Sequence, residues 1–577
     1  MKSSKTSKTG ASHMADSDPA ASGWRSGTAV RRCEVKVLCK DPYFARNRNL
    51  KLVDLEITGE EYLGPGPTSR RVAVVDYNAD LDVVFEPAAV RADGGGFVVG
   101  RLGTNYRENI KFRQVNVWAV INRTLSILED SRLLGRPIPW ASGQGRLLVL
   151  PHAGYGENAF YDRKTGAIHF LYFEGVSGEQ VYTCLSHDIV THELGHAVLD
   201  GLKPGYNELS SAETAAFHEF FGDALAITSS LTFRELLAEI VGKTRSVELD
   251  KVVGEIAAEF GSARGGDPFL RSAAVFHSMS ELGGTQEEHS LSEVLTNTFY
   301  EFLKRRYRIK LREVLARDGK SEPNGGHAVR ALVNATSEAS QVFLRAIDYC
   351  PPVDVSFAQY ARAIVAADTV AYPTKPAARN LVVELLSERG IVPEAFRPLE
   401  NRHLSKGYDV ERIAATFSDA AQFLDANRPA LGIPMTANIR IQNVYRTKKS
   451  TASGYLPPQE VVIEFGWTEE VALQGSKYRK LDGTRATLHC GGTLVFDRTG
   501  NVLHYVLAGD TPERRRTLLA YIEYLVRRGR LGVREQGFGS ESAAHHQVQA
   551  TVDGNRVTFA RDAALRHGAT HLRRRYT

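Results

Sequence analysis

The stretch from Cys184 to Asp200, CLSHDIVTHELGHAVLD, is the part of the chain that decides the fold. It contains no proline, and its apolar residues recur at helical spacing, so it predicts one helix. His192 and His196 stand four residues apart and therefore share one face of that helix. Their imidazoles can bind one metal ion with Glu193 beside them, and this HExxH pattern predicts a catalytic zinc site.

A catalytic zinc ion needs a third protein ligand, and the next predicted helix supplies one. That helix follows Ser210-Ser-Ala-Glu213, which has the pattern of a capping box. Glu219 and Asp223 are four residues apart on it. Glu219 can bind the ion, while Asp223 accepts a hydrogen bond from the far nitrogen of a ligand histidine. An HExxH string also arises by chance, on a helix that binds no metal, and the paired carboxylates argue against that alternative.

The spacing after the second histidine separates the classes of HExxH protease. Three-histidine enzymes carry glycine and histidine three and six residues further on, where this chain has Leu199 and Leu202. The two-histidine, one-glutamate pattern remains. With it, residues 110 to 350 resemble the thermolysin-like zinc metallopeptidases, the gluzincins.

The resemblance implies further site residues. Asn158 and Ala159, within Gly156-Glu-Asn-Ala-Phe-Tyr161, resemble the edge strand that binds substrate backbone. Tyr206 resembles the tyrosine that steadies the tetrahedral intermediate, and His289 resembles the catalytic histidine. Arg271 resembles the arginine that grips the substrate carbonyl. A surface histidine and a surface salt-bridge arginine are the alternatives for the last two.

The predicted fold class is α+β, with a β-rich N-terminal lobe and a mainly helical lobe of the thermolysin-like type, followed by a smaller α+β C-terminal domain. Short β-type runs broken by glycine and proline precede the zinc motif, and helical periodicity follows it. The predicted segments are a vector-derived leader over 1–13, disorder over 14–30, the β-rich part and upper lobe over 31–180, the helical lobe over 181–428 and the C-terminal domain over 435–577.

Composition excludes several classes of partner. The chain has 577 residues, with 72 basic and 67 acidic side chains for a net charge of +5, too diffuse to predict a nucleic-acid or membrane partner. The arginine clusters at 514–516, 527–530 and 573–575 are expected on a solvated face. Five cysteines without CxxC spacing, no apolar run of about 18 residues and no signal pattern predict a cytoplasmic protein.

The sequence therefore predicts a zinc endopeptidase of narrow specificity inside the cell, with Glu193 as general base and a protein or peptide as substrate. One zinc ion is the expected cofactor. Calcium is doubtful, because Asp188 matches one calcium-site position of the family but residues 227–235 contain no dense acidic cluster. The C-terminal domain is expected to bind a regulatory protein. The alternative function is a latent or degenerate protease domain that acts as a binding scaffold.

Overall fold

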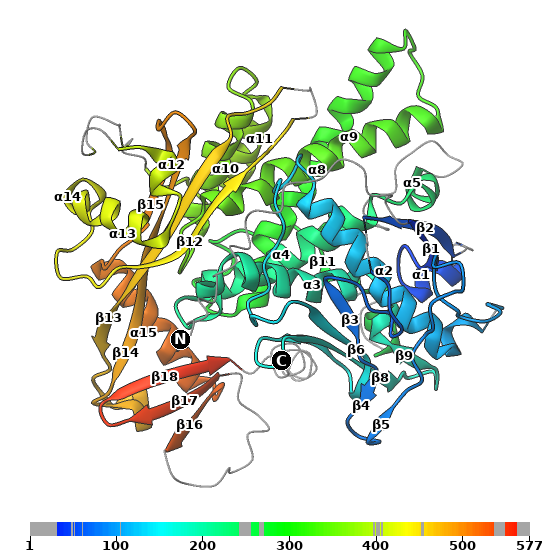
Figure 1. Cartoon of the computed structure of the whole chain (residues 1–577), viewed down its shortest axis with the longest axis horizontal. Coiled ribbons are helices and arrows are strands. Elements are labelled where there is room, and N and C mark those ends of the chain that lie inside the picture. The colour runs from blue at the N-terminus through cyan, green and yellow to red at the C-terminus, as the bar shows by residue number, and fades with distance from the viewer. Residues whose placement is uncertain are drawn as a thin grey trace, which may run out of the picture.

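The computed structural model describes residues 32–47, 50, 52–59, 62–103, 105–241, 255–264, 271–395, 399, 404, 408–451, 455–535 and 548–561. Helices and strands both contribute large parts of it, which confirms the mixed α+β class (Figure 1). The leader predicted over 1–13 and the disorder predicted over 14–30 lie outside the described residues.

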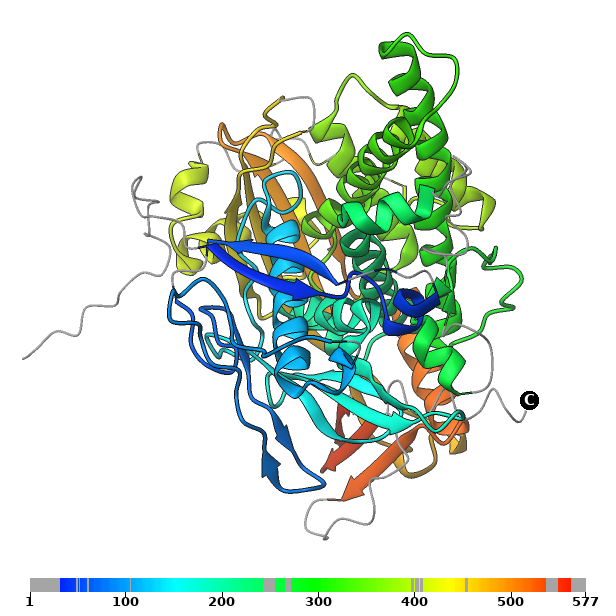
Figure 2. The same cartoon turned by 90° about the vertical axis from the view of Figure 1, so that its right-hand side faces the viewer.

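The N-terminal part is built on a five-stranded mixed sheet in the order β3-β6-β8-β7, with β9 also paired to β8. A hairpin of alternating buried and exposed residues, β1 with β2, packs on helix α2, and Figure 2 shows it crossing that helix. Strand β7 ends the sheet, so one of its edges is open within the described residues. The bounds are β1 Arg32–Val37, β2 Val53–Thr58, β3 Val72–Val74, β4 Tyr77–Asn78, β5 Val83–Val84, β6 Leu147–Tyr155, β7 Ala159–Asp162, β8 Ala167–Glu174, β9 Gln180–Tyr182 and α2 Ile110–Glu129.

The middle of the chain is mainly helical, as the periodicity predicted. Helices α3 and α4 are buried along almost their whole length and lie side by side, with α8 against α4. The bounds are α1 Pro42–Asn47, α3 His187–Leu202, α4 Ala212–Ser230, α5 Arg234–Val241, α7 Ala258–Ala263, α8 Glu288–Arg317, α9 Gly325–Leu344, α10 Phe357–Ala371, α11 Ala377–Glu388, α12 Val410–Ile413, α13 Phe417–Ala426 and α14 Arg428–Leu431, with the short strands β10 Glu255–Ile256 and β11 Arg271–Ser272.

Two glycines set how closely α3 and α4 approach. A Cβ atom added at Gly195 would lie 2.7 Å from the Cα of Gly222, and one added at Gly222 would lie 2.7 Å from Nδ1 of His192. Real Cβ atoms do not come this close to other atoms. The absence of side chains at these positions therefore lets the faces of α3 and α4 that carry His192 and Gly222 come into direct contact.

The predicted capping box before α4 is wrong. Ser211, and not Ser210, caps the helix by accepting a hydrogen bond from the backbone N–H of Thr214. Glu213 does not bond back to the cap, because its carboxylate accepts the backbone N–H of Phe357 at 2.6 Å. A tertiary contact has thus replaced the local one that the sequence pattern favours.

The C-terminal part forms a seven-stranded sheet in the order β12-β13-β14-β18-β17-β16, with β15 paired to β14 and helix α15 packed nearby. A turn from Asp497 to Asn501 joins β14 to β15, and Asp497 fixes it by accepting the backbone N–H groups of Thr499 and Asn501. The bounds are β12 Arg440–Thr447, β13 Glu460–Ala472, β14 Arg485–Asp497, β15 Val502–Ala508, α15 Pro512–Arg527, β16 Leu531–Glu535, β17 Val548–Asp553 and β18 Arg556–Arg561.

Buried ion pairs join this sheet to the helical lobe. The ammonium of Lys203, just after α3, contacts Glu464 of β13 and donates to the carbonyl of Cys350 at 2.9 Å. Lys449 lies 2.8 Å from Asp348, which is fully buried. One cluster of buried apolar residues continues from the helices into β13 and β14. A separate folding unit from residue 435 stays a prediction.

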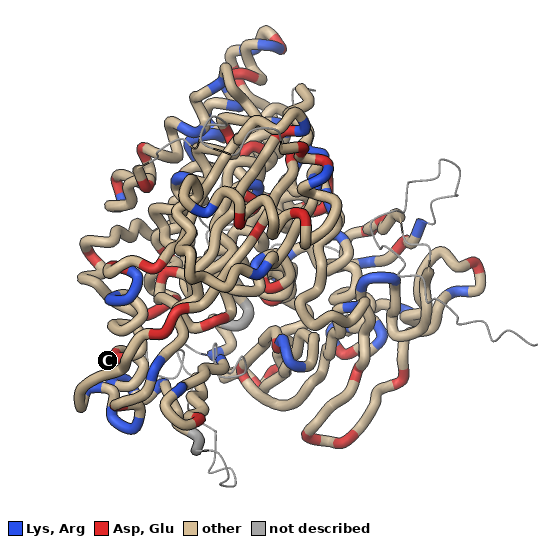
Figure 3. The backbone as a smooth tube through the Cα atoms, turned by 60° about the vertical axis from the view of Figure 1, so that its left-hand side comes forward, with Lys and Arg blue, Asp and Glu red and all other residues tan. Residues whose placement is uncertain are grey.

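Charged side chains of both signs are interspersed along the chain (Figure 3). The solvated face predicted for the arginine clusters is wrong at two positions. Arg514 is bound to Asp354 at 2.7 Å, and Arg530 lies 3.5 Å from Glu288, with only 14% and 13% of their side chains exposed. Among the described residues, no helix combines the length and apolar character that crossing a membrane requires.

Candidate metal centre and active-site cleft

Helix α3 brings the two predicted histidine ligands and Glu193 together. Its N-cap is Ser186, which accepts a hydrogen bond from the backbone N–H of Ile189. One possible ligand atom from each of His192, Glu193 and His196 lies within 4.8 Å of the others, and all three residues are buried. The four-residue spacing places both rings on the side of α3 that faces α4.

Glu219 of α4 completes a donor set that fits zinc. Its carboxylate oxygens lie 3.4 Å from Nε2 of His192 and 3.6 Å from Nε2 of His196. Donors around a tetrahedral zinc ion, with bonds of about 2.0–2.1 Å, are separated by about 3.4 Å. The observed distances exceed the roughly 2.7–2.9 Å of a direct charge-assisted hydrogen bond. The three side chains are therefore spaced as ligands that share one cation.

Asp223 fixes the orientation of the first histidine, as predicted from its spacing. Its Oδ1 lies 3.0 Å from Nδ1 of His192, and its Oδ2 accepts a hydrogen bond from the hydroxyl of Thr296 at 3.2 Å. Asp223 is fully buried. A carboxylate in this place holds the proton on Nδ1, which leaves Nε2 free to bind a metal.

His218 orients the second histidine, His196, as Asp223 orients His192. This role was not predicted from the sequence. The Nδ1 atoms of His218 and His196 are 3.4 Å apart, and one of them donates to the other. A proton on Nδ1 of His196 directs its Nε2 toward Glu219. His218 directly precedes Glu219 in the chain, and a polar residue beside a ligand is the only sequence signal that could have identified it.

The open edge of β7 runs past Glu193. The backbone N–H of Tyr161 donates to Oε2 of Glu193 at 3.2 Å, which fixes the carboxylate beside the two ligand histidines. Ala159 pairs with Phe170 of β8, so the predicted edge strand is present. Asn158 directly precedes it, and its carbonyl accepts the N–H of Leu171. An extended peptide can add to the open edge through main-chain hydrogen bonds.

His289 reaches the centre from the N-terminus of α8. Its Nε2 lies 3.6 Å from Glu219, and its Nδ1 lies 2.9 Å from Glu287, the N-cap of the helix. Burial opposes the charged form of His289, but Glu219 and Glu287 outweigh it and raise its pKa. Burial likewise opposes the charged form of Glu287, but its bonds to His289 and the N–H of Ser290 hold its pKa well below the ordinary value. Sequence reasoning missed Glu287.

The prediction for Tyr206 is corrected by the structure. A short turn, η3 (Pro204–Asn207), directs its ring into the core, where it is fully buried and its hydroxyl donates to the carbonyl of Pro351 at 2.8 Å. Burial raises the pKa of this phenol well above the ordinary value. The prediction for Arg271 is not tested, because its side chain lies outside the described part of the chain.

Asp188, the residue that matches a calcium-site position of the family, is paired with a lysine. The ammonium of Lys40, before α1, contacts Oδ2 of Asp188, and both side chains are at most 4% exposed. The backbone N–H of Ala257 donates to the same oxygen at 3.1 Å. The charge of Asp188 is thus compensated by the chain itself, which gives a physical reason for the doubt about calcium.

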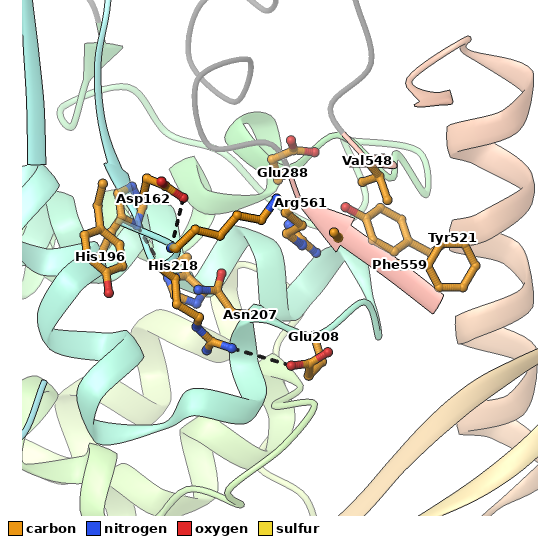
Figure 4. A pocket seen from close by; sticks show the side chains of 14 residues that line it. Asp162, His196, Asn207, Glu208, His218, Glu288, Tyr521, Val548, Phe559 and Arg561 are labelled. Carbon is orange, nitrogen blue, oxygen red and sulfur yellow. Dashed lines mark hydrogen bonds and ion pairs between the residues drawn. The ribbon is translucent and has the colours of Figure 1, made fainter. Parts of the chain in front are cut away.

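A cleft of about 220 Å³ opens beside His196 and His218. Figure 4 shows that its far wall comes from the C-terminal sheet, where Phe559 and Arg561 of β18 lie across the cleft from the histidines. This wall stands more than 300 residues from the zinc motif in the chain, so no local pattern could have identified it.

No family model matches the chain. No curated protein is similar to it either.

Proposed function

We propose that the protein is a zinc-dependent endopeptidase. The observation that carries the proposal is the donor set of His192, His196 and Glu219, buried and spaced for one tetrahedral ion, with Glu193 beside it at the open edge of β7. A peptide paired with that edge would pass directly over Glu193. The resemblance to the gluzincins points to the same chemistry.

When bound, zinc would supply Lewis-acid polarisation of a peptide carbonyl and of a water molecule. The chain itself provides the remaining steps. Glu193 takes a proton from the attacking water and returns it to the leaving amine. Glu287 accepts the Nδ1 proton of His289 and so stabilises the charged imidazolium, in which Nε2 also carries a proton and donates it to the developing oxyanion. The edge of β7 holds the substrate backbone extended.

We further propose narrow substrate specificity, inside the cell. The C-terminal sheet forms a wall across the cleft, which restricts the shape of segments that can enter. All five cysteines are buried and none is in a disulfide, as suits a reducing compartment. The C-terminal unit, beyond the cleft wall it supplies, offers surface for a regulatory partner.

The test compares purified wild-type protein with Glu193→Gln, each with and without a zinc chelator. Glu322→Gln is the matched control, because Glu322 is exposed on the loop before α9. We expect wild type and Glu322→Gln to generate new termini in a peptide library and a host extract, and Glu193→Gln to retain zinc without cutting. Zinc-loaded wild-type protein that cuts nothing and stays bound to one protein would instead support the binding scaffold.

A further inference from the structure

The cleft beside the metal centre has two walls of different origin. His196, His218 and the β7–β8 turn with Lys164 form one wall. The hairpin of β17 and β18 forms the other, through Phe559 and Arg561, with Tyr521 of α15 behind them (Figure 4). A substrate held on the edge of β7 would therefore also touch the C-terminal hairpin.

Arg561 has unused hydrogen-bonding capacity at this wall. Its Nε and Nη2 atoms are buried and have no hydrogen-bond partner within the described residues. The guanidinium lies over the ring of Tyr521, with its carbon 5.9 Å from the centre of the ring. Buried N–H donors without acceptors are costly, and a guanidinium can donate through five N–H groups. Arg561 is thus placed to donate hydrogen bonds to an acceptor group of a bound ligand.

The acidic residues of the cleft already have partners. Glu208 lies 3.5 Å from Arg163, and Glu288 lies 3.5 Å from Arg530. Asp162 accepts the hydroxyl of Thr165 at 2.9 Å within its own turn.

The cations are not balanced in the same way. Lys164 is exposed and makes no ion pair with any residue that the structure describes. Together with Arg561, it leaves the cleft with two positive groups that face the path of the substrate. Their charge is complementary to a carboxylate.

We propose that Arg561, assisted by Lys164, binds a carboxylate of the peptide substrate and makes the enzyme selective for peptides that carry one at a fixed distance from the cleaved bond. The inference rests on the proposed function. A guanidinium can hold a carboxylate through two parallel hydrogen bonds, which fixes its position as well as its charge. The carboxylate can belong to an aspartate or glutamate side chain or to the C-terminus of the peptide.

The experiment measures kcat/KM for matched peptides with wild type, Arg561→Gln and Arg556→Gln. The peptides differ by glutamate against glutamine at each position, and by a free acid against an amide at the C-terminus. Arg556 is the control, because it lies on the same strand but its side chain is 73% exposed and pairs with Glu470. Thermal unfolding of all three proteins checks that they fold alike.

We expect wild type and Arg556→Gln to prefer the carboxylate at one position roughly tenfold or more, and Arg561→Gln to lose that preference while it cleaves the neutral peptide as well as wild type does. The position of the effect distinguishes a side chain from the peptide C-terminus. Equal cleavage of both peptides by wild type, or an unchanged preference in Arg561→Gln, would overturn the inference and leave the peptidase standing.

A second measurement separates this inference from the proposed function. Binding of the same peptides to zinc-loaded Glu193→Gln is followed by fluorescence anisotropy, with and without Arg561→Gln. Tighter binding of the carboxylate peptide that depends on Arg561 supports the inference even if wild type cuts nothing. Equal binding of both peptides contradicts it.

Discussion

Replacing Asp223 by asparagine tests whether the two helices form a metal centre. Asp223 is fully buried, 3.0 Å from Nδ1 of His192, and its second oxygen accepts a bond from Thr296. Asparagine keeps the shape but removes the charge that strengthens this bond. Loss of such an orienting carboxylate weakens metal binding roughly 10- to 100-fold. That is about 1.4–2.7 kcal/mol of binding free energy.

The assay is a competition titration of zinc against a chromophoric chelator. Asp553→Asn is the control, because Asp553 is exposed at the turn between β17 and β18. We expect Asp223→Asn to bind zinc at least tenfold more weakly than wild type, and Asp553→Asn to bind it equally well. A zinc affinity of Asp223→Asn within twofold of wild type would refute the geometry of the proposed centre.

Three further predictions follow from buried groups. Gly222→Ala should weaken zinc binding roughly tenfold or more in the same titration, because its Cβ displaces a ligand ring, whereas Gly325→Ala, whose Cβ has no atom closer than 3.9 Å, should not. Lys203→Met should lower the free energy of unfolding by about 3–5 kcal/mol in urea, because Glu464 then stays buried without its cation, and Lys203→Met with Glu464→Leu should recover most of that loss. Burial and the charge of Arg362 lower the pKa of His504 to about 3 in the folded protein. Between about pH 6.5 and 3 the histidine is therefore protonated in the unfolded chain but not in the folded protein, and the free energy of unfolding decreases as the pH is lowered. The fall should reach about 1.4 kcal/mol per pH unit and be smaller in His504→Gln, measured by urea unfolding at pH 5 and 7.5.

Each of these three predictions has a result that contradicts it. Equal zinc affinity in Gly222→Ala and wild type would show that the two helices can separate without cost. A double variant at Lys203 and Glu464 as unstable as the single one would show that packing, and not the lost ion pair, determines the effect. A pH dependence unchanged in His504→Gln would mean that other groups titrate in this range.

The parts of the site that depend on helical spacing could be predicted from the sequence. His192 and His196 lie on one face as soon as their segment is helical, and Asp223 shares a face with Glu219 for the same reason. The two glycines that let these helices meet could not have been recognised, because their role depends on a crossing between separate elements. Local periodicity thus located the donor set but not the contact that assembles it.

Residues whose role depends on the direction of a short turn or on tertiary contacts were harder to predict. Tyr206 matches the family's tyrosine by residue type and by its place between the two helices, yet the turn η3 directs its hydroxyl to Pro351. Glu213 has the residue type and spacing of a capping box, yet it bonds to Phe357. In both cases a polar group takes the acceptor or donor that tertiary packing offers in place of the partner that the local motif would supply.

The groups proposed for bond cleavage and those proposed for substrate choice lie on different parts of the chain. The groups proposed for bond cleavage lie on α3, α4 and α8, whose packing is continuous with the core. The groups proposed for substrate choice lie at the cleft surface, on the β7–β8 turn and on β18. Substitutions on β18 can therefore change which peptides fit without moving the donor atoms, whereas almost any change between α3 and α4 disturbs the ligands themselves. Under the proposed function, substitutions should change substrate specificity more readily than they change the cleavage chemistry. The surface that determines specificity tolerates substitution, whereas the packed core that positions the catalytic groups does not.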